Sequence, residues 1–311
     1  MTGHYVRVQR QLTGAPDAPV ALTIGNFDGV HRGHQAMLAR LVEAAEDLRL
    51  PPAVLTFEPH PREFFAPAAA PPRLSTLRTK LELFRAYGVA TTYVARFDAR
   101  FAALAPGDFV RSVLEDGLHT RWVLVGEDFR FGQGRKGDLD YLRRTAVGFS
   151  VEAMHTVSVA GERASSTAVR TALASGDVAH AAALLGRNYA LSGRVAHGDK
   201  LGRSLGYPTA NIPLRRAPAL TGIFAVRVHG VGGQARPGVA SIGVRPTVKT
   251  DAKPLLEVFM LDFSESIYGR RITVEFLHKL RDEARFADLA TLTRAIERDV
   301  GEARDYFAAQ G

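Results

Sequence analysis

The sequence of 311 residues contains no cysteine. This absence excludes disulfide bonds, thiolate metal sites and cysteine nucleophiles, so a metal ion would have to use oxygen or imidazole ligands. The sequence also lacks the run of roughly 18 apolar residues that a membrane-spanning helix needs, and its first residues lack the basic and then apolar layout of a signal peptide. We therefore expect a cytoplasmic protein without a membrane partner, and Mg²⁺ as the metal ion that suits the remaining ligands.

Clustered basic charge is also scarce, although Lys and Arg together number 40 against 32 Asp and Glu, a net charge of +8. A basic excess can indicate a nucleic-acid partner, because Lys and Arg displace counterions from a phosphate backbone. Here the basic residues are scattered in ones and twos, and no aromatic-rich nucleic-acid motif accompanies them. We expect no nucleic-acid partner, since small anionic substrates such as nucleotides explain local positive charge equally well.

The first half of the sequence alternates short apolar runs with segments of helical periodicity. The patterns predict strands at 20–24, 53–57, 91–95 and 122–125, and helices at 35–48, 78–87 and 108–116. Strands that alternate with helices predict an α/β domain with a parallel, doubly wound sheet. Ligands of such sheets bind at the carboxyl ends of the strands, so the loops that follow the strands become candidate site segments.

The pattern changes at about residue 188. Short alternating segments, separated by Gly and Pro, predict a small barrel or sandwich with strands at 191–195, 223–228, 238–243, 255–261 and 272–280. Helical periodicity returns at 286–307, where we expect a closing helix that packs on the barrel. The Ala- and Leu-rich segment 179–185 ends the first half, which gives domains of 1–186 and 187–311.

His31 and His34 stand where the first predicted strand gives way to the first predicted helix. Their spacing places both rings on one face of the first helical turn. Glycines at 25, 29 and 33 allow close approach of the backbone to a phosphate, and the helix amino end adds partial positive charge. The imidazoles could then donate hydrogen bonds to phosphate oxygens. The alternative is that two histidines near a turn are solvated or cap the helix.

The whole stretch Gly-x-Phe-Asp-Gly-x-His-x-Gly-His resembles the nucleotidyltransferase superfamily with the His-x-Gly-His signature, and in its longer form the FAD synthetase branch. The resemblance implies adenylyl transfer from ATP. It also implies an ATP site that includes Gly25, Asn26, Phe27, Asp28, His31 and His34.

Two further loops follow predicted strands, at 56–61 and 126–137. Phe129 and Phe131 offer apolar surface to a flat ring and Asp128 offers a polar anchor, although both loops could equally be turns packed by aromatic residues. The resemblance implies that these stretches line the flavin and ATP sites, with flavin contacts from His60, Pro61, Asp128, Phe129, Phe131 and Arg135.

Ser165, Ser166 and Thr167 begin a predicted helix, with Arg170 one turn inside it. Taken alone, the hydroxyls simply make a good helix start. In the resembled family the matching segment contacts ATP phosphates, which implies that Arg170 clamps the charge of the leaving pyrophosphate. Val169 stands where the family often has Ile.

The second half contains a glycine-rich stretch at 198–211 that is neither a Walker loop nor a protein-kinase glycine loop. Thr209 and Asn211 are two apart on an extended segment, so their oxygens point the same way and could hold Mg²⁺ with ATP phosphates. A plain glycine-rich hairpin is the alternative.

This stretch resembles riboflavin kinase, in which a Pro-Thr-Ala-Asn segment binds Mg²⁺ and ATP, and several further motifs match in the same order. The resemblance implies metal ligands at Thr209 and Asn211. It implies an ATP site formed by Gly198, Lys200, Gly202, Arg203, Pro208, Thr209 and Asn211, and a flavin site formed by Gly222, Phe224, Arg245, Arg281, Glu283 and Phe286.

Glu257 lies between Leu256 and Val258 on a predicted strand and faces away from both, which suits a polar site or plain solvent exposure. The resemblance implies that Glu257 is the general base that takes the proton from the ribityl 5′-hydroxyl of riboflavin. Phe259 stands on the same face where many family members have His, which could alter the polarity near the base.

The resemblance covers nearly the whole chain and identifies it as a member of the bifunctional riboflavin kinase/FAD synthetase family. It implies a Rossmann-like nucleotidyltransferase domain, followed by a small antiparallel β-barrel kinase domain with a C-terminal helix. The carboxyl domain would make FMN from riboflavin and ATP, the amino domain would join FMN to AMP, and we expect a monomer or weak homo-oligomer. The alternatives are a nucleotidyltransferase for another phosphate ester and a non-enzymatic flavin- or nucleotide-binding regulator. The presence of all four of His31, Thr209, Asn211 and Glu257 argues against the regulator.

Overall fold

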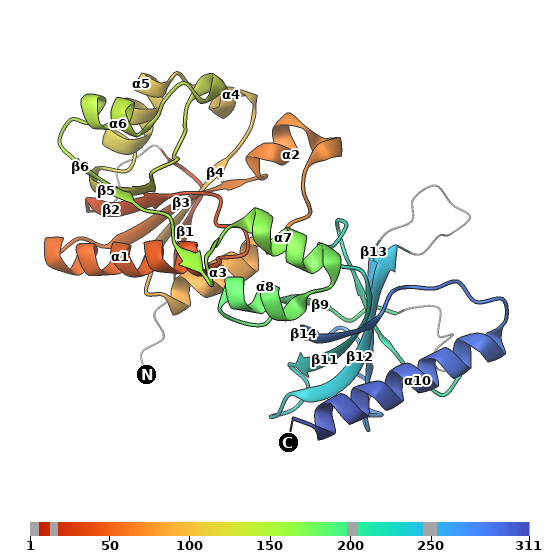
Figure 1. The fold of residues 1–311 in the computed structure, drawn as a ribbon. Helices are drawn as coiled ribbons and strands as arrows, with labels where there is room; N and C mark the ends of the chain where they lie inside the picture. The colour runs from red at the N-terminus through yellow and green to blue at the C-terminus, as the bar shows by residue number, and fades with distance from the viewer. Residues whose placement is uncertain (1–5, 13–17, 198–204, 245–253, 311) are drawn as a thin grey trace. The chain divides into compact units, whose positions relative to one another are not determined.

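The computed structural model describes residues 6–12, 18–197, 205–244 and 254–310. The chain divides into two compact units (Figure 1). The amino-terminal unit contains Met1–Pro71 and Ser75–Ser165, and the carboxy-terminal unit contains Pro72–Leu74 and Ser166–Gly311.

The amino-terminal unit is built on a six-stranded sheet in the order β1-β4-β3-β2-β5-β6, and every pair of neighbours is parallel. Its strands are β1 (Arg7–Gln9), β2 (Val20–Ile24), β3 (Pro52–Glu58), β4 (Thr91–Arg96), β5 (Thr120–Gly126) and β6 (Ser150–Met154). The strand order runs outward in both directions from β2, as a doubly wound sheet requires. The predicted parallel α/β fold is therefore confirmed, while β1 and β6 were not predicted.

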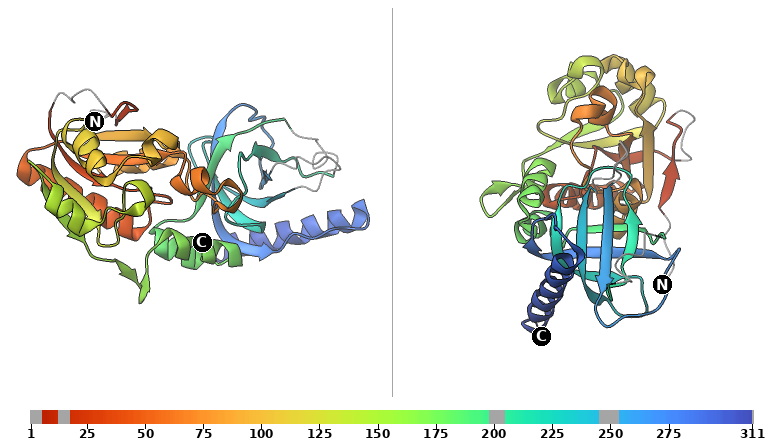
Figure 2. Two further views of the ribbon diagram at one scale, coloured as in Figure 1. Left: turned by 90° about the horizontal axis from the view of Figure 1, so that it is seen from above. Right: turned by 90° about the vertical axis from the view of Figure 1, so that its right-hand side faces the viewer.

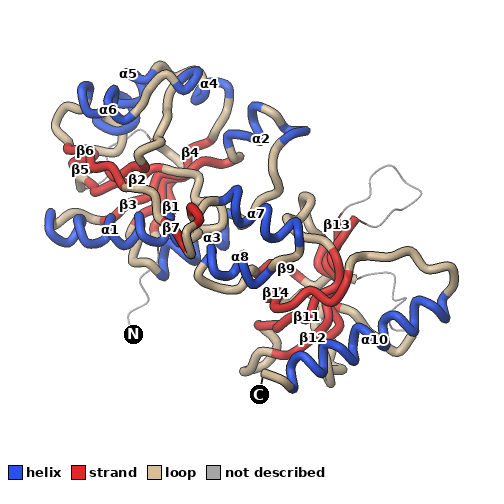
Figure 3. Tube along the Cα trace, in the orientation of Figure 1, coloured by secondary structure: helices blue, strands red, loops and turns tan. Residues whose placement is uncertain are grey.

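Helices cover both faces of this sheet (Figure 3). They are α1 (Arg32–Leu48), α2 (Pro61–Phe65), η1 (Pro67–Ala69), α3 (Leu77–Ala86), α4 (Ala99–Ala102), α5 (Pro106–Asp108), the π-helical η2 (Phe109–Glu115), η3 (Gln133–Arg135) and α6 (Leu139–Thr145). A short hairpin of β7 (Ser158–Val159) and β8 (Glu162–Arg163) follows the sheet.

Neighbouring residues of β2 belong to different hydrophobic cores, which shows how the sheet separates the two layers. Ala21 packs in the core that α1 and α3 complete with Leu38 and Phe84, whereas Leu22 packs in the core that η2 completes with Leu114. All five residues of β2 are buried, as expected for a parallel strand covered on both faces.

The carboxy-terminal unit begins with two helices, α7 (Ser166–Ser175) and α8 (Val178–Leu185). A six-stranded antiparallel sheet follows, in the order β10-β13-β12-β11-β14-β9. Its strands are β9 (Ala190–Arg194), β10 (Ala210–Pro213), β11 (Gly222–His229), β12 (Arg236–Val244), β13 (Pro254–Met260) and β14 (Arg271–Arg281). A bridge between Ala196 and Asn211 joins the two edges, so the sheet is a nearly closed barrel.

The predicted closing helix is α10 (Leu289–Ala308) (Figure 2). Its Ala303 and Val300 pack on Ile223, Ala225 and Val239 of the outer barrel face. Alternate residues of the same strands fill the barrel interior, where the ring of Phe224 meets that of Phe276 edge to face at 5.4 Å. The small antiparallel barrel with its C-terminal helix is confirmed.

The two helices α7 and α8 belong to the same compact unit as the barrel. The division between the two compact units thus falls after Ser165. The sequence predicts a domain boundary after residue 186. The domain limits of 1–186 and 187–311 remain a prediction.

Candidate active sites

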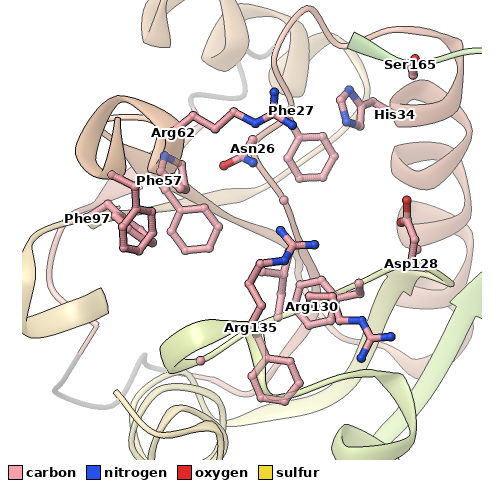
Figure 4. A pocket seen from close by; sticks show the side chains of 18 of the residues that line it. Asn26, Phe27, His34, Phe57, Arg62, Phe97, Asp128, Arg130, Arg135 and Ser165 are labelled. Carbon is pink, nitrogen blue, oxygen red and sulfur yellow. The ribbon is translucent and has the colours of Figure 1, made fainter. Parts of the chain in front are cut away.

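The amino-terminal unit contains a cavity of about 1090 Å³ where β2, β3 and β5 end (Figure 4). Two segments that sequence reasoning singled out form much of its wall, the motif after β2 and the loop after β5. The motif contributes Gly25, Asn26, Phe27, His31, Gly33 and His34, and the loop contributes residues 126–135. The expectation that the carboxyl ends of the strands share one site is met.

His31 and His34 stack on each other at the start of α1, with ring centroids 3.7 Å apart and an interplanar angle of 24°. His31 is also the N-cap of α1, because its Nδ1 accepts the backbone N–H of His34 at 3.4 Å. The capping interpretation is therefore confirmed for His31, whose ring also lines the cavity, and the phosphate-binding role of the pair stays a prediction.

Gly33 explains how backbone and ring come so close here. A Cβ at this position would lie 3.2 Å from the imidazole of His31 and 3.3 Å from the carbonyl oxygen of Ala164. A larger residue would have to displace one of them.

His34 is half-buried, and desolvation lowers the pKa of its imidazole well below the ordinary value, with further lowering by the nearby charges of His31 and Lys80. His34 is therefore neutral near pH 7 and keeps a single N–H donor. Its Nδ1 and the Oδ1 of Asn26 are buried without a hydrogen-bond partner in the part of the chain that the structure describes. Unpaired polar atoms in a cavity wall are costly unless a ligand satisfies them.

Asp28 has a different role from its motif neighbours. Its Oδ1 accepts hydrogen bonds from the backbone N–H and hydroxyl of Ser75, at 3.0 and 3.2 Å. The Ser75 hydroxyl oxygen in turn accepts the N–H of Gly29 at 2.9 Å. The described wall of the cavity does not include Asp28, so its side chain holds the loop in place, and its predicted contact with ATP stays a prediction.

Aromatic rings line the opposite part of the cavity. Phe129 and Phe131 stack with centroids 5.4 Å apart, and Phe57 meets Phe97 edge to face at 5.8 Å. The Phe129 and Phe131 pair thus packs as aromatic residues in a turn would, and it also borders a cavity large enough for a flat ring system.

Charged side chains surround these rings. Asp128 pairs with Arg163 at 2.5 Å, and Arg130 pairs with Asp138 at 2.9 Å. Arg62 and Arg135 reach into the cavity (Figure 4). Within the described residues their guanidinium groups form no ion pair, so they are available to an anionic ligand.

His60 and Pro61 differ in their relation to the cavity. Pro61 lines it, whereas His60 caps α2 by accepting the N–H of Arg62, and Glu63 returns a capping-box bond to the backbone of His60. The predicted flavin contact of His60 is thus not supported by the described wall, and it stays a prediction.

The predicted phosphate-binding segment, residues 165–170, spans the division between the two units. Ser165 lines the cavity, while Ser166, Thr167 and Arg170 lie in the first turns of α7. Arg170 donates from Nε to the carbonyl of Pro72 at 2.7 Å and from Nη1 to that of Ser166 at 3.2 Å. Its role as a clamp on pyrophosphate stays a prediction.

Sequence reasoning missed Lys80, which is 4% exposed on α3 and contacts the motif loop. The available signal was a lysine within the apolar periodicity of the predicted helix 78–87. Arg62 was missed as well, although it follows directly on the singled-out 56–61 loop.

The second candidate site lies on the outer face of the barrel. Glu257 on β13 stands opposite Asn211 on β10 and opposite Ser241 on β12, which places the three side chains in one row. Leu256 and Val258 are fully buried on the other side of the strand. The predicted orientation of Glu257 is correct, and Phe259 shares its face, with its ring 5.3 Å from that of Tyr207.

A second carboxylate accompanies Glu257. The carboxylate of Glu283 lies directly over Gly243, where a Cβ would collide with it. Burial and the charge of Glu257 raise the pKa of Glu283, while Arg281 opposes that rise. Arg281 itself holds Asp299 of α10 through two hydrogen bonds of 2.7 Å and lies over the ring of Phe286.

Thr209 and Asn211 line a small cavity of about 70 Å³ together with Pro208. The Nδ2 of Asn211 donates to the carbonyl of Thr209 at 3.3 Å. Hydroxyl and amide oxygens suit Mg²⁺. No group of three His, Asp or Glu that could hold a metal occurs among the described residues, so an ion here would complete its coordination with ligand oxygens or water.

The structure limits two flavin predictions in this unit. Phe224 is fully buried and Gly222 is buried, so their predicted flavin contacts find no exposed surface here and stay predictions. Gly198, Lys200, Gly202, Arg203 and Arg245 lie outside the described residues.

Comparisons with known proteins match a different family to each part of the chain. The FAD synthetase family model matches residues 15–168, and the riboflavin kinase family model matches residues 185–307. A bifunctional riboflavin kinase/FMN adenylyltransferase of Pseudomonas fluorescens is 52% identical over 285 residues and covers 91% of each chain. The protein of that name from Escherichia coli K12 is 47% identical and covers 97% of each chain. This chain belongs to the bifunctional riboflavin kinase/FMN adenylyltransferase family.

Family membership confirms the predicted enzyme class, a transferase with kinase and nucleotidyltransferase activities, and the predicted order of its two parts. A crystal structure of a macrolide-efflux protein from Streptococcus pneumoniae is similar over 96% of this chain and 98% of its own, with a TM-score of 0.81 and 26% identity. Among the residues described for this chain, no helix has the length and apolar character needed to cross a membrane.

Proposed function

We propose that this chain makes FAD from riboflavin in two ATP-dependent steps at separate sites. The carboxy-terminal unit phosphorylates the ribityl 5′-hydroxyl of riboflavin, and the amino-terminal unit joins the resulting FMN to AMP. The observation that supports adenylyl transfer best is the wall of the large cavity, which combines the stacked His31 and His34 with the stacked Phe129 and Phe131.

In the adenylyl-transfer step, a phosphate oxygen of FMN attacks the α-phosphorus of ATP, and the bond to the β-phosphate breaks to release pyrophosphate. The FMN phosphate is already ionised near neutral pH, so no side chain has to remove a proton. His31 and His34 donate hydrogen bonds to phosphate oxygens as charge develops, beside the positive amino end of α1. Arg62 and Arg135 bind further phosphate charge.

In the kinase step the nucleophile is a neutral hydroxyl, which needs a base. Glu257 accepts the hydroxyl proton as the oxygen attacks the γ-phosphorus and ADP leaves. Thr209 and Asn211 would hold Mg²⁺, which neutralises charge on the ATP phosphates when bound. The row of Asn211 and Glu257 on adjacent strands supports this proposal, because it puts the base beside the phosphate-handling segment.

We further propose that this protein is cytoplasmic, that it is a monomer or weak homo-oligomer, and that it has no nucleic-acid or membrane partner. Light scattering on the purified chain measures the oligomeric state, and a nucleic-acid shift assay at low salt tests the second statement.

The experiment that tests the function is incubation of the purified chain with riboflavin, ATP and Mg²⁺, followed by chromatographic separation of FMN and FAD. We expect FMN to appear before FAD, and FAD to form from added FMN without riboflavin. Omission of Mg²⁺ with a chelator present should stop FMN formation. Absence of both products would contradict the proposal.

A further inference from the structure

The motif loop after β2 has a strained backbone. Phe27 and Val30 both have positive φ, at 50° and 43°, beside Gly29 at 84°. Such conformations are unfavourable for residues with a side chain, and they persist only where surrounding contacts impose them. Residues 75–80, at the start of α3, supply several contacts to this loop.

Residues 75–80 contact the motif loop at two points, near Asp28 and at Asn26. Ser75 binds the carboxylate of Asp28 and the backbone of Gly29. Lys80, one turn into α3, donates from Nζ to the carbonyl oxygen of Asn26 at 3.0 Å. The loop is therefore fixed on both sides of Phe27.

The carbonyl of Asn26 receives a second donor from the neighbouring strand. The hydroxyl of Thr56 on β3 donates to it at 3.3 Å, and Lys80 Nζ lies 3.5 Å from the same hydroxyl. Side chains from α3 and β3 thus donate to the same carbonyl oxygen, that of Asn26, just after the end of β2. A buried ammonium is expensive to desolvate, and an apolar residue of the same length would fill this position at lower cost if packing were its only role.

Lys80 also acts on the site through its charge. It contributes, after burial and His31, to lowering the pKa of His34. His34 therefore stays a neutral hydrogen-bond donor, while the positive charge of Lys80 lies behind the loop that carries Asn26.

We propose that Lys80 is a positioning residue for adenylyl transfer, whose buried ammonium fixes the Asn26 carbonyl and places a positive charge behind the triphosphate site. Lys80 is absent from the described cavity wall, so it acts through Asn26 and through its field without touching substrate. The inference rests on the proposed function of the amino-terminal cavity.

The test is Lys80→Met, which preserves length and removes the charge and the donor. We expect kcat/KM for FAD formation from FMN and ATP to fall about 100-fold, the cost of a small misplacement of reacting groups. Formation of FMN from riboflavin by the same sample should stay at the native rate, because the residues proposed for it lie in the carboxy-terminal unit.

Arg78→Met is the matched control. Arg78 lies on the same helix, is 64% exposed and pairs with Glu82, so both variants lose one positive charge from α3. Only Lys80→Met should lose FAD synthesis. The chain has one tryptophan, Trp122 in the core of the amino-terminal unit, so its emission reports whether that unit is folded. If Lys80→Met is unfolded by this measure, Lys80→Gln is assayed against the same criteria.

A pH profile separates this role from a merely structural one. Loss of the Lys80 charge lets the pKa of His34 rise, so the acid limb of the residual activity should move to higher pH in Lys80→Met. Lys80→Arg should return the limb to its native position and recover at least about tenfold of the lost kcat/KM.

A native rate of FAD formation in folded Lys80→Met, or equal losses in Lys80→Met and Arg78→Met, would overturn the inference and leave the proposed function intact. Failure of the native chain to convert FMN into FAD would instead overturn the proposed function.

Discussion

The carboxylates near the two candidate sites have different surroundings. In the loops after β2 and β5 of the amino-terminal unit, the acidic residues are paired with other protein groups: Asp28 with Ser75, Asp128 with Arg163, and Glu127 with His155 and Thr156. Those last hydrogen bonds lower the pKa of Glu127. On the barrel, Glu257 and Glu283 lie close enough for one charge to raise the pKa of the other carboxyl.

The nucleophiles explain this difference. The FMN phosphate is an anion before it reacts, and a free carboxylate beside it would repel it. The ribityl hydroxyl must lose a proton, and a carboxylate is the group that can take it. We therefore expect a base only at the kinase site, where Glu257 is proposed for that role, because the attacking group differs in chemical state between the two steps.

The two folds also assemble their sites differently. The parallel sheet gathers loops that are distant in sequence, because all its strands end at one edge. The antiparallel barrel assembles its site by register, as in the row of Asn211, Glu257 and Ser241 across three strands. Variants that affect one site should therefore leave the other unchanged.

The largest expected effect is that of Glu257→Gln, which keeps the shape and removes the base. FMN formation should fall by about 10²- to 10⁴-fold, the usual contribution of general-base catalysis. The measurement is riboflavin phosphorylation by the purified variant. Conversion of added FMN into FAD by the same sample is the control, and equal loss of both activities would show that the sites are not separate.

His31→Ala should have the converse effect. Loss of one donor to the developing phosphate charge is expected to slow FAD formation by about 10²- to 10³-fold, with FMN formation unchanged. Because His31 also caps α1, alanine should further cost about 1 kcal/mol of stability.

His31→Asn separates the two roles. Asparagine is a good N-cap residue, so this variant should regain the stability, as measured by urea unfolding followed through Trp122 emission. It should not regain FAD synthesis. Native activity in His31→Asn would reduce the role of His31 to capping.

Much of this molecule was accessible from the sequence. The predicted strand 20–24 coincides with β2, and the alternation around Glu257 gave its orientation correctly, because burial on one face of a strand leaves a period of two in the sequence. The position of the two histidines at the start of a helix was likewise readable from the glycines and the following apolar periodicity.

The residues that escaped prediction act through tertiary contacts. In the sequence, Lys80 cannot be distinguished from an ordinary helix lysine. Only the fold brings its Nζ to the carbonyl oxygen of Asn26. Asp28 reads as a ligand group in a motif, but Ser75, 47 positions further on, takes its carboxylate. The resemblance implied a flavin contact for Phe224, and the fold adds that its ring packs against that of Phe276 in the barrel interior. No local pattern records which distant partner a polar side chain will meet.

A smaller effect is expected for Ser75→Ala, which tests the anchoring of the motif loop. The variant loses the hydroxyl that donates to Asp28 and accepts from Gly29, and each such hydrogen bond contributes about 0.5 to 1.5 kcal/mol to stability. Urea unfolding followed by Trp122 emission measures this loss. Ser112→Ala, at an exposed hydroxyl of the same unit, is the control, and equal stabilities of the two variants would refute the anchoring role.

The smallest expected effect concerns pH and sharpens the contrast between a neutral histidine site and a carboxylate site. The folded state holds His34 neutral because burial lowers its pKa, whereas in the unfolded chain it binds a proton below pH about 6.5. The unfolded state therefore binds more protons on acidification, and stability should decline as the pH falls through that value. His34→Asn should show a shallower decline than the native chain in urea unfolding followed at Trp122. His119→Asn, outside the cavity wall of the same unit, is the control, and a native slope in His34→Asn would mean that His34 is not held neutral, which would also remove the electrostatic part of the role proposed for Lys80.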